Sequence, residues 1–115
     1  MCEIINSGTQ PIQNLGVLQR IAALAGDEAK GPWAVETIKK GLTAFEAQVK
    51  ETKGKYCVGD TVSMADICLV PQIYNANRFG MPLDDFPSIN AILEALKEHP
   101  AFVKSDAANQ PDAVQ

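Results

Sequence analysis

The fold of this chain is decided by the stretch Gly59-Asp60-Thr61-Val62-Ser63-Met64-Ala65-Asp66-Ile67-Cys68-Leu69-Val70-Pro71. Ser63 and Asp66 have the spacing of a capping box, in which each side chain bonds the backbone N–H of the other residue. Val62 and Ile67 occupy the two positions of a hydrophobic staple around that box. The sequence therefore predicts that a helix begins at Ser63, with Ser63 and Asp66 as its structural cap.

The residues that follow this cap are almost wholly apolar as far as Pro71. A helix that is apolar all round is normally a buried one, and this run is too short to span a bilayer. We therefore predict a buried central helix from Ser63 to about Phe79.

The composition describes one domain of ordinary polarity. The chain has 115 residues, of which 46% are hydrophobic and 21% are charged, as expected for a single globular domain. The net charge of −4 argues against a nucleic-acid partner, which would require a basic surface. The sequence shows no signal peptide. Three cysteines without metal-ligand spacing indicate reduced thiols in a cytoplasmic protein, with Cys57 and Cys68 as buried apolar residues.

Helical periodicity flanks the central helix on both sides. We expect one helix or two bent helices over 1–25, a polar loop over 26–31, an amphipathic helix from Trp33 to about Glu51, and a helix from Pro87 to about Glu98. The charged residues of 33–51, Glu46 among them, are expected to face solvent. His99-Pro100 ends the last helix, where His99 has a capping or surface role. The prediction is an all-α bundle of about four to five helices over 1–103 and a loosely attached polar tail over 104–115.

The candidate binding residues are polar groups at two places in the chain. Gln10 and Asn14 are four residues apart, which would put both amides on one helix face. Arg78 lies at the polar end of the central helix, where it either binds a carboxylate or interacts with the helix dipole. No phosphate-binding loop, metal cluster or supported catalytic pair is present in the sequence, so no catalytic residue and no metal site are predicted.

Four spaced blocks together resemble the zeta class of glutathione transferases, the maleylacetoacetate isomerases. They are Gln10-Pro11-Ile12-Gln13-Asn14-Leu15, Tyr56-Cys57-Val58-Gly59-Asp60, Met64-Ala65-Asp66-Ile67-Cys68-Leu69-Val70-Pro71-Gln72 and Asn75-Ala76-Asn77-Arg78-Phe79. The resemblance extends over essentially the whole chain. It implies the C-terminal helical domain of such an enzyme, without the N-terminal thioredoxin-like domain that activates the thiol of glutathione.

The resemblance also implies a function and a set of site residues. Members of that class add glutathione to the cis double bond of maleylacetoacetate and eliminate it again to give fumarylacetoacetate, a step of tyrosine and phenylalanine catabolism. By position, Gln10, Asn14, Leu15 and Gly16 would help to bind glutathione, whose main contacts belong to the thioredoxin-like domain. Arg78 would bind a carboxylate of the anionic substrate. The parent protein would be a cytoplasmic homodimer, and this chain alone would be inactive.

Two alternatives to the isomerase domain remain at this stage. The chain could be a non-catalytic interaction module, because similar helical domains serve in the assembly of translation proteins. It could also be a truncated or designed helical domain, because Met1 precedes a helical segment with no capping residue. The amides of Gln10 and Asn14 together with Arg78 favour the enzyme over the interaction module, which has no need of them.

Overall fold

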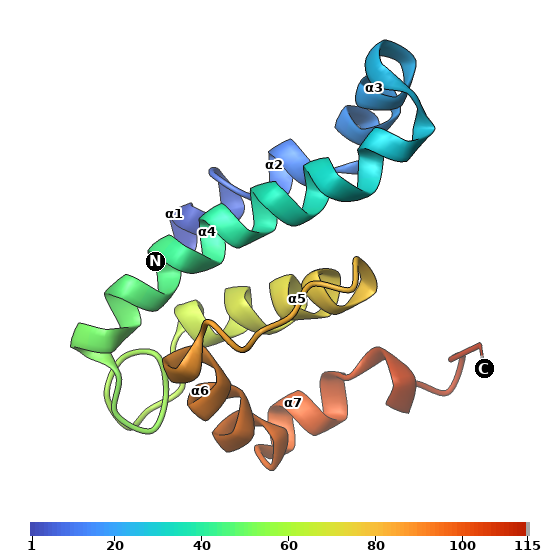
Figure 1. Ribbon diagram of the computed structural model, residues 1–115. Helices are drawn as coiled ribbons and strands as arrows, with labels where there is room; N and C mark the ends of the chain where they lie inside the picture. Colours follow the sequence, from blue (N-terminus) through green and yellow to red (C-terminus); the bar gives the residue numbers. More distant parts are fainter. Residues whose placement is uncertain (115) are drawn as a thin grey trace.

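The computed structural model describes residues 1–114, and its regular structure in that range is helical (Figure 1). The α-helices are α1 (Cys2–Asn6), α2 (Gln10–Gln13), α3 (Leu15–Ala25), α4 (Lys30–Thr52), α5 (Met64–Arg78), α6 (Pro87–Lys97) and α7 (Pro100–Ser105). Two short 3₁₀ helices are η1 (Asp27–Ala29) and η2 (Ala107–Asn109). A single isolated bridge pairs Lys53 with Gly59 in the loop before α5. The predicted all-α class is confirmed.

The N-terminal segment forms three helices, where the sequence predicted one or two. The chain breaks after α1 near Gly8, and it breaks again at Asn14, whose backbone is extended at φ −66° and ψ 162°. Asn14 ends α2 and caps α3, because its side chain accepts a hydrogen bond from Val17 N. The prediction that Gln10 and Asn14 share one helix face is therefore wrong.

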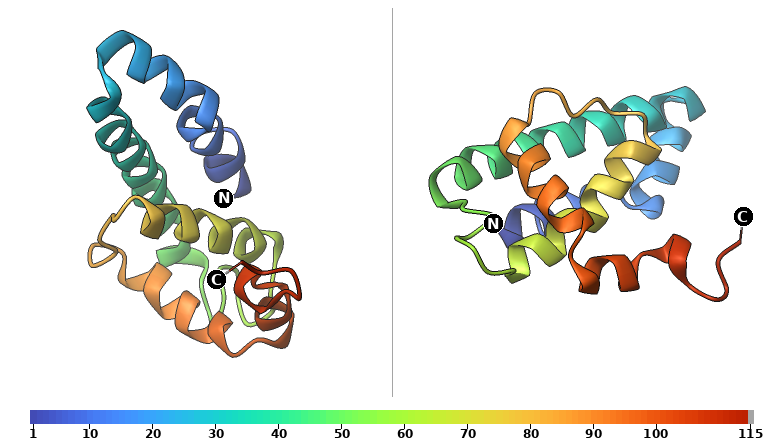
Figure 2. Two further views of the ribbon diagram at one scale, coloured as in Figure 1. Left: turned by 90° about the vertical axis from the view of Figure 1, so that its right-hand side faces the viewer. Right: turned by 90° about the horizontal axis from the view of Figure 1, so that it is seen from below.

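The long helix α4 contacts α1, α2, α3, α5 and α6 and so organises the domain. In Figure 2, α1 to α3 run back along α4, α5 lies beside α1 and α4, and α6 packs against α4. The helix begins at Lys30, two residues before Pro32, because η1 replaces most of the predicted loop over 26–31. Gly26 has a positive φ of 95° and ends α3, as a C-cap glycine should.

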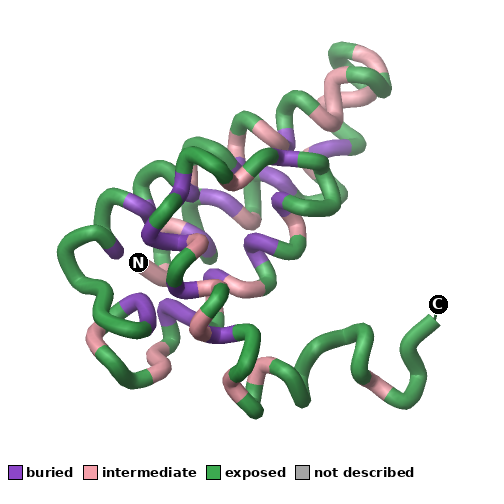
Figure 3. Tube along the Cα trace, turned by 60° about the horizontal axis from the view of Figure 1, so that its bottom comes forward, coloured by how far each residue is buried: buried purple, intermediate pink, exposed green. Residues whose placement is uncertain are grey.

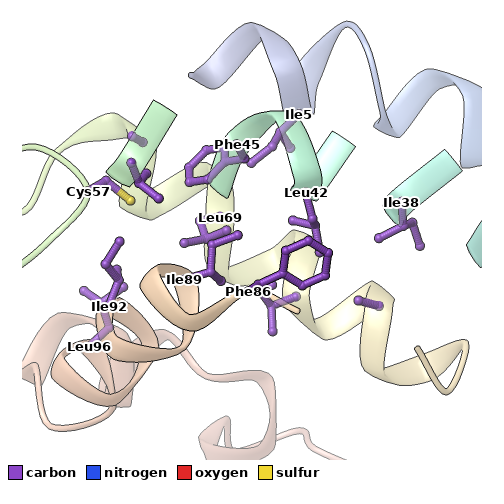
Figure 4. Close-up of a cluster of buried hydrophobic side chains, with 14 of the residues drawn as sticks. Ile5, Ile38, Leu42, Phe45, Cys57, Leu69, Phe86, Ile89, Ile92 and Leu96 are labelled. Atoms are coloured by element: carbon purple, nitrogen blue, oxygen red, sulfur yellow. The ribbon is translucent and has the colours of Figure 1, made fainter. Parts of the chain in front are cut away.

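The core lies between α4, α5 and α6, and Ile5 of α1 joins it near Phe45 (Figure 4). The apolar residues at helical spacing in the predicted amphipathic helix form a stripe on α4, made of Ile38, Leu42, Phe45 and Val49, and this stripe is fully buried. Leu69 of α5 and Ile89, Ile92 and Leu96 of α6 meet that stripe. The apolar periodicity in the sequence therefore identified the packing faces of α4 and α6 correctly.

Glu46 departs from the predicted solvent-facing side of α4. Its side chain is only 4% exposed, and its two carboxylate oxygens accept hydrogen bonds from Ser88 N and Ile89 N, each at 2.9 Å. These two N–H groups belong to the first turn of α6, where the helix itself provides no acceptor. A carboxylate also interacts favourably with the positive end of the helix dipole. Glu46 thus caps α6 from a neighbouring helix.

Helix α5 begins and ends where the sequence predicted. Ser63 is its N-cap, the capping box with Asp66 is present, and Phe79 is its C-cap. Gly80, at φ 67°, reverses the chain directly afterwards. The described structure therefore confirms Ser63 and Asp66 as the structural cap of this helix.

The prediction that α5 is buried all round is wrong. Ala65, Leu69 and Ile73 face the core, but Met64, Ile67 and Tyr74 are between 53% and 66% exposed. Figure 3 shows buried and exposed positions alternating along this helix. The apolar sequence covers two faces, and only one of them meets other helices within residues 1–114.

The C-terminal segment continues regular structure further than predicted. Helix α7 extends to Ser105, and His99 caps it by accepting from Ala101 N through Nδ1, which confirms the capping role. The side chain of Gln110 donates to Lys104 O and Asp106 O, so the tail folds back on itself. Residues 104–114 are nearly all exposed, and Gln115 of the predicted tail lies outside the described residues. Among residues 1–114, no helix combines the length and apolarity that crossing a membrane requires.

Candidate functional site

Four of the predicted site residues lie at the junction between α2 and α3. Gln10 opens α2 and is partly buried, whereas Asn14, Leu15 and Gly16 are exposed. Asn14 Oδ1 is occupied by its 3.0 Å hydrogen bond from Val17 N. The amide nitrogen of Asn14 therefore remains as a donor that points away from the cap.

The first turn of α3 adds backbone donors to this junction. The N–H groups of Leu15 and Gly16 precede the first intrahelical hydrogen bond and have no acceptor within the helix. A Cβ atom at Gly16 would meet only Asn14 Oδ1, at an ordinary contact distance of 3.5 Å. The structure therefore has room for a small side chain at this position, and glycine adds no group of its own beside the two backbone amides. Together these groups form a small set of neutral and dipolar donors suited to a carboxylate or a peptide group.

Arg78 is the last residue of α5, and its side chain is exposed. The ion pairs found within residues 1–114 join Lys30 to Asp27, Lys39 to Asp85 and Lys97 to Glu94, so Arg78 takes part in none of them. Its guanidinium group is thus available for two-point binding of a carboxylate. Its place in the last turn equally suits an interaction with the helix dipole.

The structure connects the two parts of this candidate site by a buried contact. Gln72 Nε2 of α5 donates to Gln13 Oε1 of α2 at 3.2 Å, with the side chains 0% and 7% exposed. Trp33 Nε1 of α4 donates to Ile12 O and links α2 to α4. Gln10 and Asn14 flank Gln13 in sequence, and Arg78 follows Gln72 by six residues, about 9 Å along the helix axis.

Sequence reasoning missed the role of Gln72. The signal was a single polar residue on the core face of an apolar run, between Pro71 and Ile73. A buried amide requires a partner, so this residue could have been flagged as one half of a contact between helices. Its partner could not be predicted, because Gln13 is 59 residues away in sequence.

The thiols do not form a second candidate site. Burial raises the pKa of Cys57 far above its usual range, and the hydrogen bond and negative charge of Asp66 raise it further. Burial also raises the pKa of Cys68, as does the neighbouring thiol of Cys2. Cys57 is fully buried as predicted, whereas Cys68 is only partly buried. Within residues 1–114, no group of histidine, cysteine or acidic side chains could hold a metal ion.

Two surface hollows among the described residues lie away from the predicted site. One is lined by Lys55, Tyr56 and His99, and the other lies between α4 and Phe86. Neither includes Gln10, Asn14 or Arg78.

Comparison with known proteins shows which family this chain belongs to. The family described as "Glutathione S-transferase, C-terminal domain" matches residues 19–104, which is more than half of the chain. This chain belongs to the glutathione transferase family. The four sequence blocks indicated the zeta class, and the holo structure of a bacterial maleyl pyruvate isomerase described as zeta class superposes with a TM-score of 0.90 at 34% identity, covering 98% of this chain and 55% of that chain.

Named relatives of this glutathione transferase domain are isomerases. The chain is 47% identical over 110 residues to the maleylacetoacetate isomerase of Rattus norvegicus, a match that covers 96% of this chain and 49% of the rat protein. The chain therefore spans about half the length of the curated relatives it matches.

Solved structures similar to this chain are also maleylacetoacetate isomerases, matched over about half of their length. A crystal structure of maleylacetoacetate isomerase from Anaeromyxobacter dehalogenans 2CP-1, with bound GSH in its active site, superposes with a TM-score of 0.94. It is 38% identical, and the match covers 98% of this chain and 52% of that chain. A second structure of the same protein holds dicarboxyethyl glutathione and citrate in its active site, at a TM-score of 0.93, 38% identity and a coverage of 98% and 51%.

Proposed function

We propose that this chain is the substrate-side helical domain of a glutathione-dependent cis-trans isomerase that converts maleylacetoacetate to fumarylacetoacetate. The observation that carries the proposal is the similarity to an isomerase with bound GSH, because that similarity extends over 98% of this chain at a TM-score of 0.94. It includes both the α2–α3 junction and the end of α5, where the candidate residues lie.

In this proposal the α2–α3 junction binds part of glutathione. When bound, glutathione supplies the thiolate nucleophile of the reaction. Asn14 and the exposed amides of Leu15 and Gly16 donate to its carboxylate or peptide oxygens, and the amide of Gln10 adds a donor and an acceptor. These groups fit such a ligand because they are neutral donors at a helix N-terminus. Most contacts to glutathione belong to a thioredoxin-like half, so the chain alone binds it weakly.

Arg78 supplies the recognition of the substrate. Its guanidinium group forms no ion pair within residues 1–114, so it is free to bind a carboxylate in two-point geometry. Such binding orients the double bond of the substrate relative to the sulfur of glutathione. Citrate, a carboxylate compound, lies in the active site of the related isomerase, and this supports a carboxylate-binding role for Arg78.

The same proposal covers the partners and the location. The chain works beside an N-terminal thioredoxin-like domain, in a homodimer, in the cytoplasm, and in the breakdown of tyrosine and phenylalanine. The half-length match to the relatives supports the first of these points. Three free thiols in residues 1–114 are compatible with the reducing conditions of the cytoplasm.

A chimaeric enzyme tests the proposal. Joining the N-terminal half of the rat maleylacetoacetate isomerase to this chain should give an enzyme that isomerises maleylacetoacetate only when glutathione is present. The rat N-terminal half alone and this chain alone are the controls, and both should be inactive. A folded, glutathione-binding chimaera without isomerase activity would contradict the proposal and favour an interaction module.

A further inference from the structure

The contact between Gln13 and Gln72 stands out because it is a side-chain hydrogen bond made inside the protein. Gln72 is 0% exposed and Gln13 is 7% exposed, and their 3.2 Å bond joins two helices that are far apart in sequence. A second side-chain hydrogen bond to α2 runs from Trp33 Nε1 of α4 to Ile12 O. Gln13 thus provides the polar link between α2 and α5.

This pair is poorly suited to a purely stabilising role. Gln72 Oε1 is buried and has no hydrogen-bond partner among residues 1–114. A buried polar atom without a partner is unfavourable, and replacing both members of such a pair by apolar side chains of similar shape can be nearly neutral. An apolar pair would therefore fold equally well, but it would lack the directional bond that fixes the position of one helix relative to the other.

The elements that the pair joins carry the two halves of the proposed site. Gln13 is the last residue of α2, directly before Asn14, Leu15 and Gly16. Gln72 lies in α5, upstream of Arg78 at the end of the same helix. A shift of α2 relative to α5 would therefore move the proposed glutathione contacts relative to the proposed carboxylate contact.

We propose that Gln72 is a positioning residue, which acts through Gln13 to fix the α2–α3 junction relative to Arg78. The inference rests on the proposed function, since it assigns the pair a role in holding the proposed glutathione contacts of the α2–α3 junction in place. Gln72 touches neither ligand in this account, so its effect is on geometry and not on chemistry.

The first test uses this chain alone. In the double variant Gln13→Met with Gln72→Met, the urea midpoint should be unchanged or higher, because methionine has a similar length and no unpaired polar atom. Amide hydrogen exchange over residues 10–18 should become faster by about 3- to 10-fold, the loss expected for one hydrogen bond. Exchange in α4 should not change. Gln48→Met, at an exposed glutamine of α4, is the matched control and should change neither quantity.

The second test uses the chimaera with the rat N-terminal half. The double variant should raise KM for glutathione about 3- to 10-fold and leave kcat within about 2-fold. A merely structural role would lower the urea midpoint and reduce kcat through loss of folded enzyme, with KM unchanged; that result would overturn the inference. Unchanged exchange over residues 10–18 would also overturn it. If the chimaera with the unmutated chain is inactive, the proposed function fails, and the exchange experiment still decides whether the pair positions α2.

Discussion

Asp66 connects two parts of the chain through one buried carboxylate. Its Oδ2 accepts from the backbone N–H and the side chain of Ser63, at 2.8 and 2.9 Å, and its Oδ1 accepts from Cys57 N at 2.9 Å. The same residue therefore caps α5 and holds the loop that precedes it. A capping box alone would account only for the contacts with Ser63.

We predict that Asp66→Ala destabilises the domain more than Ser63→Ala does. Ser63→Ala should cost about 0.5–2 kcal/mol, as for other N-cap residues. Asp66→Ala also leaves the N–H of Cys57 buried without a partner, and its total cost should be about 2–4 kcal/mol. Urea unfolding of the two variants measures the difference. Equal midpoints would mean that the bond to Cys57 contributes nothing.

The stability that Asp66 provides should depend on pH. Burial of the carboxylate tends to raise its pKa, but hydrogen bonds from Cys57 and Ser63 outweigh burial and hold the pKa below its ordinary value. A carboxyl group whose pKa is lower in the folded state stabilises that state above the pKa of the unfolded chain, about 3.9, and this contribution is lost as pH falls through the folded pKa. Asp66→Asn should therefore differ most from the unmutated chain near neutral pH and less below about pH 4.

The three cysteines should differ sharply in reactivity. Cys57 is buried, and its raised pKa leaves almost no thiolate near neutral pH. Cys2 and Cys68 are partly exposed. Titration with an aromatic disulfide reagent at neutral pH should modify Cys57 only after unfolding in urea, and Cys57→Ala should leave the native reaction unchanged. Rapid modification of Cys57 in the native domain would contradict the packing of the loop before α5.

At the scale of residues, local patterns were predictable and distant partners were not. The Ser63–Asp66 box was predictable because both halves lie within one helical turn. The roles of Glu46 and Gln72 were not, because their partners are 42 and 59 residues or more away. Gln10, Asn14 and Arg78 were singled out by their polarity and spacing, the family resemblance assigned their ligands, and the structure supplied their surroundings.

At the scale of elements, α6 depends on a cap that α4 provides. Glu46→Ala would leave two first-turn N–H groups of α6 without an acceptor, and we expect a loss of about 2–4 kcal/mol in the free energy of unfolding. Glu46→Gln keeps one oxygen acceptor, so its free energy of unfolding should lie between that of the unmutated chain and that of Glu46→Ala. Glu36→Ala, at an exposed glutamate of the same helix, is the control and should cost less than about 0.5 kcal/mol. A loss at Glu46 no larger than that at Glu36 would contradict the capping role.

Periodicity predicted the long helices well and the N-terminal segment poorly. The α4 and α6 stripes repeat over several turns, so their buried faces could be read from the sequence. The helical segment 1–25 is interrupted twice. A turn forms near Gly8, and Asn14 caps α3 instead of continuing α2. The one-sided burial of α5 could not be read from its sequence, because both of its faces are apolar.

At the scale of the whole molecule, α5 leaves an apolar face uncovered. Met64, Ile67 and Tyr74 are exposed at helical spacing, and no other element within residues 1–114 covers them. An exposed apolar patch of this kind favours association, so this chain alone should self-associate in sedimentation at high concentration. Met64→Lys with Ile67→Lys should restore a monomer, whereas Val103→Lys on α7 should not. A sharp monomer for the unmutated chain would contradict the prediction.

The central claim is that this domain provides the recognition of an anionic substrate, and Arg78 tests it most directly. The measurement is kcat/KM for maleylacetoacetate in the chimaera with the rat N-terminal half, together with the melting temperature of each variant. Arg78→Ala should lose one charge-assisted bond, about 1.5–3 kcal/mol or on the order of 10- to 150-fold in kcat/KM, with little change in melting temperature. Arg78→Lys should recover only part of that loss, and Arg20→Ala, at the exposed arginine of α3, should have no effect. If Arg78→Ala leaves kcat/KM intact and lowers the melting temperature, Arg78 interacts with the helix dipole and the account of substrate binding is wrong.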